Sequence, residues 1–198
     1  VVFSNGGSAK QIRSQAYWEE KLKLINDAIK AGSSAIQLDY IRYSSKEPAN
    51  PQHAKDVYKV IKWFKEKINA QHVPMEIDIF GEVSYYPSLH IGQDIEMFSD
   101  SVDGVNPMVY PSHYPFNFNG LGDPNKHPYE VVHFAMEGAV NRAVIASTSP
   151  NKLRPWLQDF DLGADYDAAK VRAQIQALDD IIASSTTGLA PLEAGRPR

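Results

Sequence analysis

Short apolar runs alternate with amphipathic helical stretches along most of the chain. Apolar residues recur at helical spacing within 17–31, 50–70, 128–143 and 165–182. Between these stretches stand four runs with the length of a strand: "SAIQLDYI", "VPMEIDIFG", "DGVNPMVYP" and "LRPWLQDF". Strands that alternate with helices are typical of βαβ units, in which the strands pair in parallel. The sequence therefore predicts an α/β fold with about four βα units.

Length and composition narrow the classes of function. A chain of 198 residues is long enough for one domain, but a full eight-stranded α/β barrel typically takes about 250 residues. The net charge of −4 and the lack of a basic stripe argue against a nucleic-acid partner. No apolar run reaches the roughly 20 residues of a membrane span. The N-terminus shows neither a signal peptide nor an initiator methionine, so we expect the chain to begin inside a longer protein.

The two faces of the predicted strands differ in polarity. Successive side chains of a strand point to opposite faces, so an apolar set (Ile36, Leu38 and Tyr40 in the first strand) can pack on the helices. The side chains on the other face, most of them polar, are Gln37, Asp39, Glu76, Asp78, Phe80, Arg154, Trp156 and Gln158. Burying unpaired carboxylates under helices costs several kcal/mol, whereas a barrel gathers them along its axis. The pattern therefore favours an incomplete (β/α)8 TIM barrel.

Asp39 stands at the C-terminal end of the first predicted strand. Barrel active sites form at this end of the strands, which makes Asp39 a candidate for catalysis or ligand binding. The alternative is an ion pair with Arg42 or Arg154 that only holds the barrel mouth together.

Several segments together resemble one known family. "AIQLDYIRY", "IDIFGE", "VNPMVYPSHY", "HPYEVV" and "RPWLQDF" are similar, in this order, to a bacterial family of glycoside hydrolase domains once catalogued as a domain of unknown function. The resemblance runs from about Tyr17 to Ile182. It implies a TIM-barrel glycosidase that acts on carbohydrate without a cofactor or metal, and export or a cell-envelope location. It also implies that the four strands are the fourth to seventh of the barrel, with three upstream.

Glycoside hydrolysis requires two carboxyl groups, one protonated and one ionised. The resemblance makes Asp39 the nucleophile or ion-stabilising group, since several barrel glycosidases carry an acid at the end of the fourth strand. Asp78 has the same inward parity on the adjacent strand, about 4.8 Å away, which suits the separation of about 5–5.5 Å in a retaining pair. Glu82 in the following loop is the competing acid. Asp78 could instead be a structural acid bonded to backbone amides.

The remaining candidates would bind substrate or orient the acids. They are Gln37, Arg42, Tyr110, His113, Arg154, Gln158 and Asp159, with Asp159 expected on the rim. His113 could instead hold its own turn. Trp156 is expected in the barrel core rather than as a sugar platform. Aromatic side chains in the long loop after Tyr110 could stack on sugar rings or pin the loop to the surface.

Two other classes of function stay open at this point. One is a carbohydrate-binding barrel of the cell envelope without turnover. The other is a metal-dependent hydrolase that uses Asp39, Asp78 and His113. The second is weaker, because the sequence has neither cysteine nor an HxH or HExxH motif.

The C-terminus departs from the family pattern. The family closes with an eighth strand that resembles Gly-Trp-Leu-Leu-Trp, whereas this chain reads "TTGLAPLEAGRPR". One set of codons for Gly188 to Arg198, shifted by one base, would read Gly-Trp-Leu-Leu-Trp-Lys-Pro-Ala-Ala-Arg. We hypothesise that a frameshift replaced the last strand, so that 1–188 form the partial barrel and 189–198 an aberrant tail. Sequencing of the coding DNA tests this hypothesis.

Overall fold

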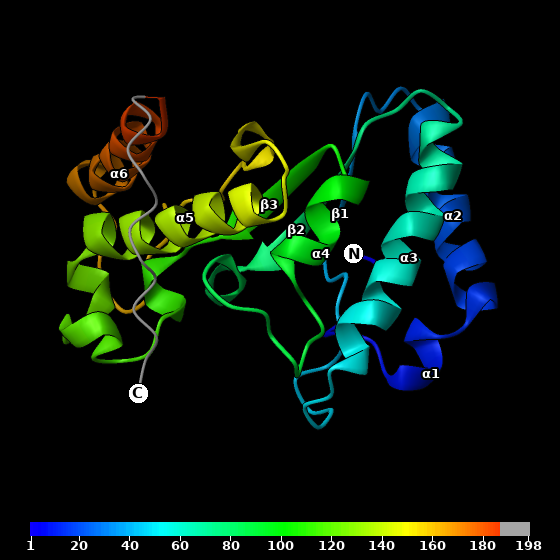
Figure 1. Ribbon diagram of the computed structural model, residues 1–198, viewed down its shortest axis with the longest axis horizontal. Coiled ribbons are helices and arrows are strands. Elements are labelled where there is room, and N and C mark those ends of the chain that lie inside the picture. Colours follow the sequence, from blue (N-terminus) through cyan, green and yellow to red (C-terminus); the bar gives the residue numbers. More distant parts are fainter. Residues whose placement is uncertain (187–198) are drawn as a thin grey trace.

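A computed structural model describes the backbone of residues 1–186 and the side chains up to residue 184. A sheet lies in the middle of the molecule, with α2 and α3 on one side and α5 and α6 on the other (Figure 1). The helices are α1 (Ala9–Ile12), α2 (Gln15–Lys30), α3 (Gln52–Asn69), α4 (Ile95–Phe98), α5 (Pro128–Ile145) and α6 (Ala168–Thr186). The strands are β1 (Ile36–Leu38), β2 (Met75–Phe80) and β3 (Gly104–Met108). The expected tail, 189–198, lies outside the described residues.

The sheet is parallel, in the order β1-β2-β3. Leu38 pairs with Ile77 of β2, and Asp78 pairs with Asn106 of β3. Each edge is extended by a further parallel segment. On one side the Val2 amide donates to the carbonyl of Asp39 at 2.8 Å, and on the other Trp156 forms a bridge with Met108. This arrangement confirms the predicted α/β fold with parallel strands.

Most of the apolar stripes predicted from the sequence contribute to the core. The stripe predicted within 165–182 is wrong, because its members Ile175 and Ile182 are exposed and Ala177 and Ile181 are buried in their place. Ile36 and Leu38 of β1 are buried, as are Met75, Ile77 and Ile79 of β2. The buried side chains of α3 include His53, Ala54 and Asp56 together with the whole predicted stripe, Val57, Val60, Ile61, Phe64 and Ile68. Burying a side chain of this size stabilises a fold by about 1.5–3 kcal/mol. The stripes therefore fix which face of each strand meets the helices and leave the other face for the site.

Two predicted strands are shorter or less regular than expected. β1 ends at Leu38 because the next residues turn, and Tyr40 has a φ of 55°, in the left-handed region. Its expected place on the apolar face beside Leu38 is therefore wrong. The run after residue 152 makes only the bridges Val105 to Leu153 and Met108 to Trp156. Pro107 lacks the N–H that a continuous ladder with this segment needs.

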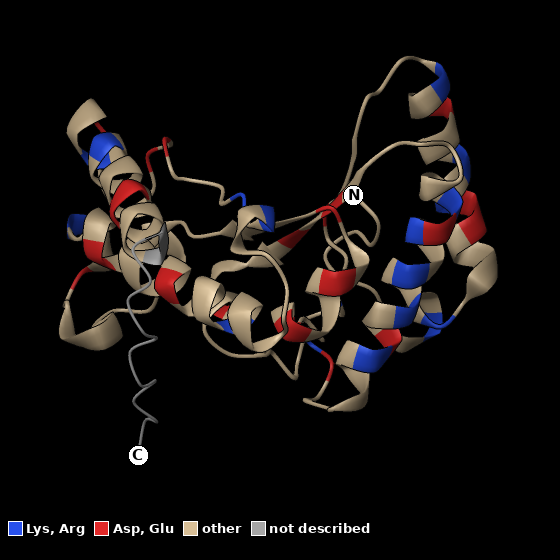
Figure 2. Cartoon of the chain, turned by 45° about the horizontal axis from the view of Figure 1, so that its top comes forward, with Lys and Arg blue, Asp and Glu red and all other residues tan. Residues whose placement is uncertain are grey.

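Charged residues of both signs share the outer helices. Lys side chains lie among Asp and Glu side chains along α2 and α3 (Figure 2). Across the described part of the chain, no helix combines the length and apolarity that a membrane crossing requires.

Candidate active site

A cavity of about 640 Å³ opens at the carboxyl ends of the three strands. Its walls come from the last residues of β1, β2 and β3 and from the loops that follow them. The lining residues are Asp39, Tyr40, Arg42, Asp78, Phe80, Gly81, Glu82, Tyr85, Gln93, Met108, Tyr110, His113, Tyr114, Pro115, Phe160 and Leu162. Barrel enzymes place their active sites at this end of the strands. The cavity is therefore the candidate site.

Three carboxyl groups reach this one cavity. Asp39 directly follows β1, Asp78 belongs to β2, and Glu82 lies in a short 3-10 turn, η1 (Gly81–Ser84). Burial raises the pKa of Asp78, and the charge of Asp39 contributes to the rise. Leu38 pairs with Ile77 in the parallel register, so the next residues, Asp39 and Asp78, stand at neighbouring strand ends.

Asp78 is buried, with 7% of its surface exposed. Burial raises the pKa of its carboxyl group above the ordinary value of 3.8, and the nearby charge of Asp39 adds to this. The Gln37 side-chain amide and the Trp156 indole, at 3.0 Å, both donate to Oδ1 and act against the rise. No backbone amide of the described residues donates to this carboxyl group, so the structure does not have the arrangement expected of a purely structural acid.

The raised pKa of Asp78 predicts a pH-dependent effect on stability. Between pH 3.8 and the higher native pKa, the folded state binds more protons at this site than the unfolded state, so wild-type stability falls as pH rises through that interval. Asp78→Asn removes this contribution and keeps an oxygen for both donors. We expect the melting temperature of Asp78→Asn, relative to wild type, to rise with pH across the interval. Thermal unfolding at several pH values measures it.

The exposed Asp179 on α6 provides the control, because Asp179→Asn makes the same charge change outside the cavity. Its melting temperature relative to wild type should not follow this trend. If the two variants change alike with pH, burial does not perturb Asp78.

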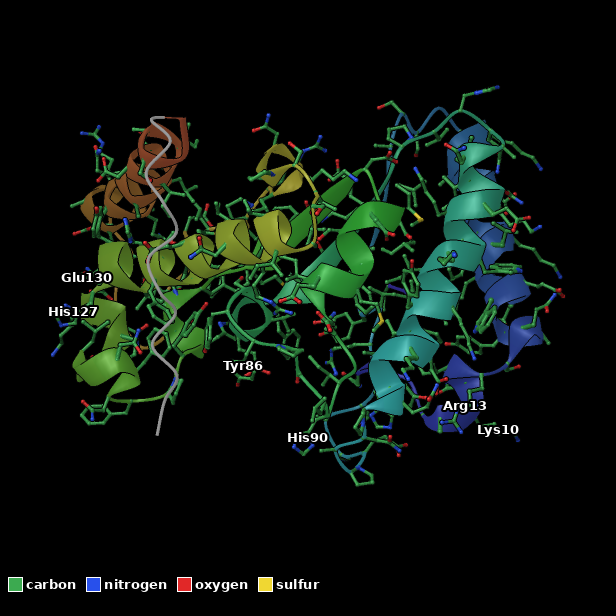
Figure 3. All side chains as sticks on the ribbon, in the orientation of Figure 1. Lys10, Arg13, Tyr86, His90, His127 and Glu130 are labelled. Atoms are coloured by element: carbon green, nitrogen blue, oxygen red, sulfur yellow. The ribbon has the colours of Figure 1, made fainter. Side chains whose placement is uncertain are left out.

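The turn that carries Glu82 is tied to α4 and α5. Arg142 of α5 donates to the carbonyl of Val83 at 2.8 Å, to Asp94 at 2.6 Å and to Glu96 at 2.8 Å. Its side chain is 7% exposed, so the guanidinium is buried with its partners around it. The Glu82 carboxylate itself accepts a hydrogen bond from the Tyr86 hydroxyl at 3.3 Å. In Figure 3, Tyr86 lies near the middle of the molecule, between His127 on one side and Arg13 on the other.

Two aromatic groups border the cavity. In the first, Tyr85, Tyr114, Phe118 and Phe134 contact one another with ring centroids 4.7–5.9 Å apart. In the second, Tyr110 lies 5.2 Å from Phe160 and 5.3 Å from His113. The first group anchors the long loop, which was one of the two roles expected for its aromatic side chains. Tyr114 of this group also lines the cavity.

Several sequence candidates take positions other than those expected. Gln158 is fully buried, accepts from the Ser112 amide at 3.1 Å and donates to the Phe160 carbonyl at 3.0 Å. It therefore anchors loops and does not make the expected contact with acids or substrate. Arg154 forms an ion pair with Glu76, below the cavity, rather than with Asp39. Asp159 is exposed and does not line the cavity. Gln37 does not line the cavity either, but its side-chain amide donates a hydrogen bond to Asp78, which does.

Sequence reasoning missed two contributors to this site. The indole of Trp156 contacts Asp78 and is 47% exposed, so Trp156 is not the core residue that was expected. The sequence did indicate this contact, because the alternation of side chains places Trp156 and Asp78 on the same face of the sheet. The buried side chain of Gln93 accepts from the Phe80 amide at 2.9 Å and donates to the carbonyls of Asp78 and Ile41. It joins the ends of β1 and β2, and no motif marks it.

The same geometry bears on the metal-dependent alternative. Asp39, Asp78 and His113 line one cavity. Within the described residues, however, no three His, Asp or Glu side chains come together as possible ligands of one ion.

Comparisons with known proteins bear on the family and the fold. No curated protein matches the sequence. Solved structures with a similar fold include the spore cortex-lytic enzyme SleL of Bacillus megaterium QM B1551, with a TM-score of 0.55 and 13% identity over 89% of this chain and 41% of that chain. A class V chitinase of Pseudomonas fluorescens Pf-5 gives a TM-score of 0.53 and 19% identity over 72% of this chain and 41% of that chain.

A third similar structure is catalytic domain 2 of the Ostrinia furnacalis Group II chitinase, with a TM-score of 0.52 and 10% identity over 74% of this chain and 40% of that chain. The chain thus spans about two fifths of the length of these structures. Together with the parallel sheet, this confirms the prediction of an incomplete TIM barrel. Residues 6–187 match the model of the family described as "Putative glycosyl hydrolase domain", and the chain belongs to that family.

Proposed function

We propose that this chain carries the catalytic carboxylates of a glycoside hydrolase that cleaves O-glycosidic bonds of an oligo- or polysaccharide. The observation that carries the proposal is the convergence of Asp39, Asp78 and Glu82 on one cavity at the strand ends. A hydrolase of this kind needs one carboxylate that stays ionised and one carboxyl group that holds a proton. Different environments around two acids create that difference.

Asp78 is assigned the role of general acid. Its pKa is raised by burial, which favours the protonated form, and both side-chain donors reach Oδ1. Oδ2, the oxygen that neither of these two donors reaches, would present the proton to the glycosidic oxygen. Asp39 would attack the anomeric carbon as that bond breaks, and water would then hydrolyse the covalent intermediate with Asp78 acting as base.

The cavity suits a carbohydrate. Its volume lies within the range of about 300–1,000 Å³ that is typical of small-molecule sites. Tyr110 and Tyr114 offer aromatic rings and hydroxyl groups along its wall. The similar structures are a spore cortex-lytic enzyme and chitinases, which supports a glycan as the substrate class.

Hydrolysis of a panel of polysaccharides tests the proposal. We expect new reducing ends from at least one glycan, and NMR of the first product should show the anomeric configuration of the substrate, because adjacent strand ends suit a retaining pair. Inversion would refute the pairing of Asp39 with Asp78. Binding of a glycan with no cleavage of any would instead support the alternative, a non-catalytic carbohydrate-binding barrel of the cell envelope.

A further inference from the structure

Arg42 is a buried cation on the wall of the cavity. Its residue surface is 7% exposed, and its Nη1 donates to the carbonyl of Tyr43 at 2.9 Å. Its Nε is buried without a hydrogen-bond partner, and within the described residues no carboxylate forms an ion pair with it. A guanidinium has five N–H donors, so most of its capacity is unused.

The surroundings hold this guanidinium in one place. It lies 5.0 Å from the centroid of the Tyr40 ring and 4.7 Å from that of Phe80, which are cation–π distances. A Cβ atom on Gly6 would come within 2.6 Å of Nη1, so the backbone of Gly6 closes off one side. Because these contacts already hold the Arg42 side chain in place, binding of a ligand would cost little conformational entropy at this residue.

The charged groups near Arg42 leave its charge incompletely matched. Asp39 attracts the guanidinium electrostatically, yet the two do not approach within ion-pair distance, and desolvation lowers the pKa of Arg42. Asp78 and Glu82 line the same cavity, and each has other hydrogen-bond partners. A neutral sugar placed here would remove more water from the cation without supplying a countercharge.

We propose that the glycan carries a carboxylate beside the bond to be cleaved and that Arg42 binds this carboxylate. This inference rests on the proposed function and adds the substrate class. A planar guanidinium matches a carboxylate with two parallel hydrogen bonds, and the two Nη atoms together can supply such a pair. The carboxylate could belong to a hexuronic acid or to a lactyl ether on an amino sugar, and the chemistry of recognition is the same in both cases.

Binding of matched glycans to the intact protein tests the inference by calorimetry. One arm uses oligogalacturonate, the other a glycan that contains N-acetylmuramic acid, and each is paired with its carboxyl-reduced form. We expect at least one acidic glycan to bind about tenfold or more tightly than its reduced partner. Arg42→Gln should bring the two forms within about twofold. Arg42→Lys should recover part of the preference, because lysine keeps the charge and loses the fork.

The outcomes separate this inference from the hydrolase proposal. The arm that shows the preference identifies the source of the carboxylate. Equal affinity for acidic and reduced forms in both arms, or no binding of either acidic glycan, overturns the inference, and this comparison needs only wild type. An Arg42→Gln variant that weakens both forms equally also overturns it. Preferential binding without cleavage refutes the hydrolase and leaves the carboxylate site.

Discussion

Asp39→Asn should lower kcat/KM on the cleaved glycan by at least about 10³-fold, with glycan binding retained. The side chain follows β1 directly and lines the cavity, so it can reach the anomeric carbon of a bound sugar. An amide has nearly the same shape as a carboxylate but is neither a useful nucleophile nor a countercharge for an oxocarbenium ion. Initial rates and calorimetry on the same glycan measure the two quantities separately.

Asp179→Asn is the matched control, since it removes one negative charge from an exposed position on α6. Its rate should stay within about twofold of wild type because surface changes away from a site have small effects. A rate for Asp39→Asn as high as that of the control would remove Asp39 from the mechanism. A loss of binding together with rate would assign Asp39 to substrate recognition.

The main features of the fold could be predicted because its packing repeats along the sequence. The stripe from Val57 to Ile68 on α3 and the alternation of Met75, Ile77 and Ile79 on β2 are local patterns that report burial directly. Parallel pairing then fixes the edge of the sheet where Asp39 and Asp78 emerge. Those two steps were enough to predict that Asp39 and Asp78 lie at the same end of the sheet, where both line the cavity.

The rest of the site depends on contacts that local patterns do not record. The left-handed turn at Tyr40 moves that side chain from the helix-facing surface to the cavity wall. Gln93 is polar and fully enclosed, with hydrogen bonds to residues 13, 15 and 52 positions away in the chain. The in-and-out alternation of side chains stops at Gln158, because its side chain forms hydrogen bonds with loop residues Ser112 and Phe160. Long-range hydrogen bonds of this kind have no periodicity.

The choice between Asp78 and Glu82 as the acid can be made with two substrates. A general acid protonates the leaving group, and its removal costs about 10²–10⁴-fold when that group is a poorly leaving sugar alkoxide. A nitrophenolate leaves without protonation. Asp78→Asn should therefore lose about 10²–10⁴-fold on the natural glycan and far less on a dinitrophenyl glycoside of the same sugar.

Glu82→Gln is the decisive comparison, since both acids line the cavity and both variants replace a carboxyl group by an amide. Glu82 lies on η1 and is held by the Tyr86 hydroxyl at 3.3 Å, whereas the pKa of Asp78 is raised by burial and by Asp39. Only a group that keeps its proton at the working pH can act as the acid, which is the argument for Asp78. If Glu82→Gln shows the dependence on leaving group and Asp78→Asn loses rate equally on both substrates, Glu82 is the acid. Asp78 would then be a positioning residue for Asp39. Hydrogen bonds from Gln37 and Trp156 hold Asp78 itself in place.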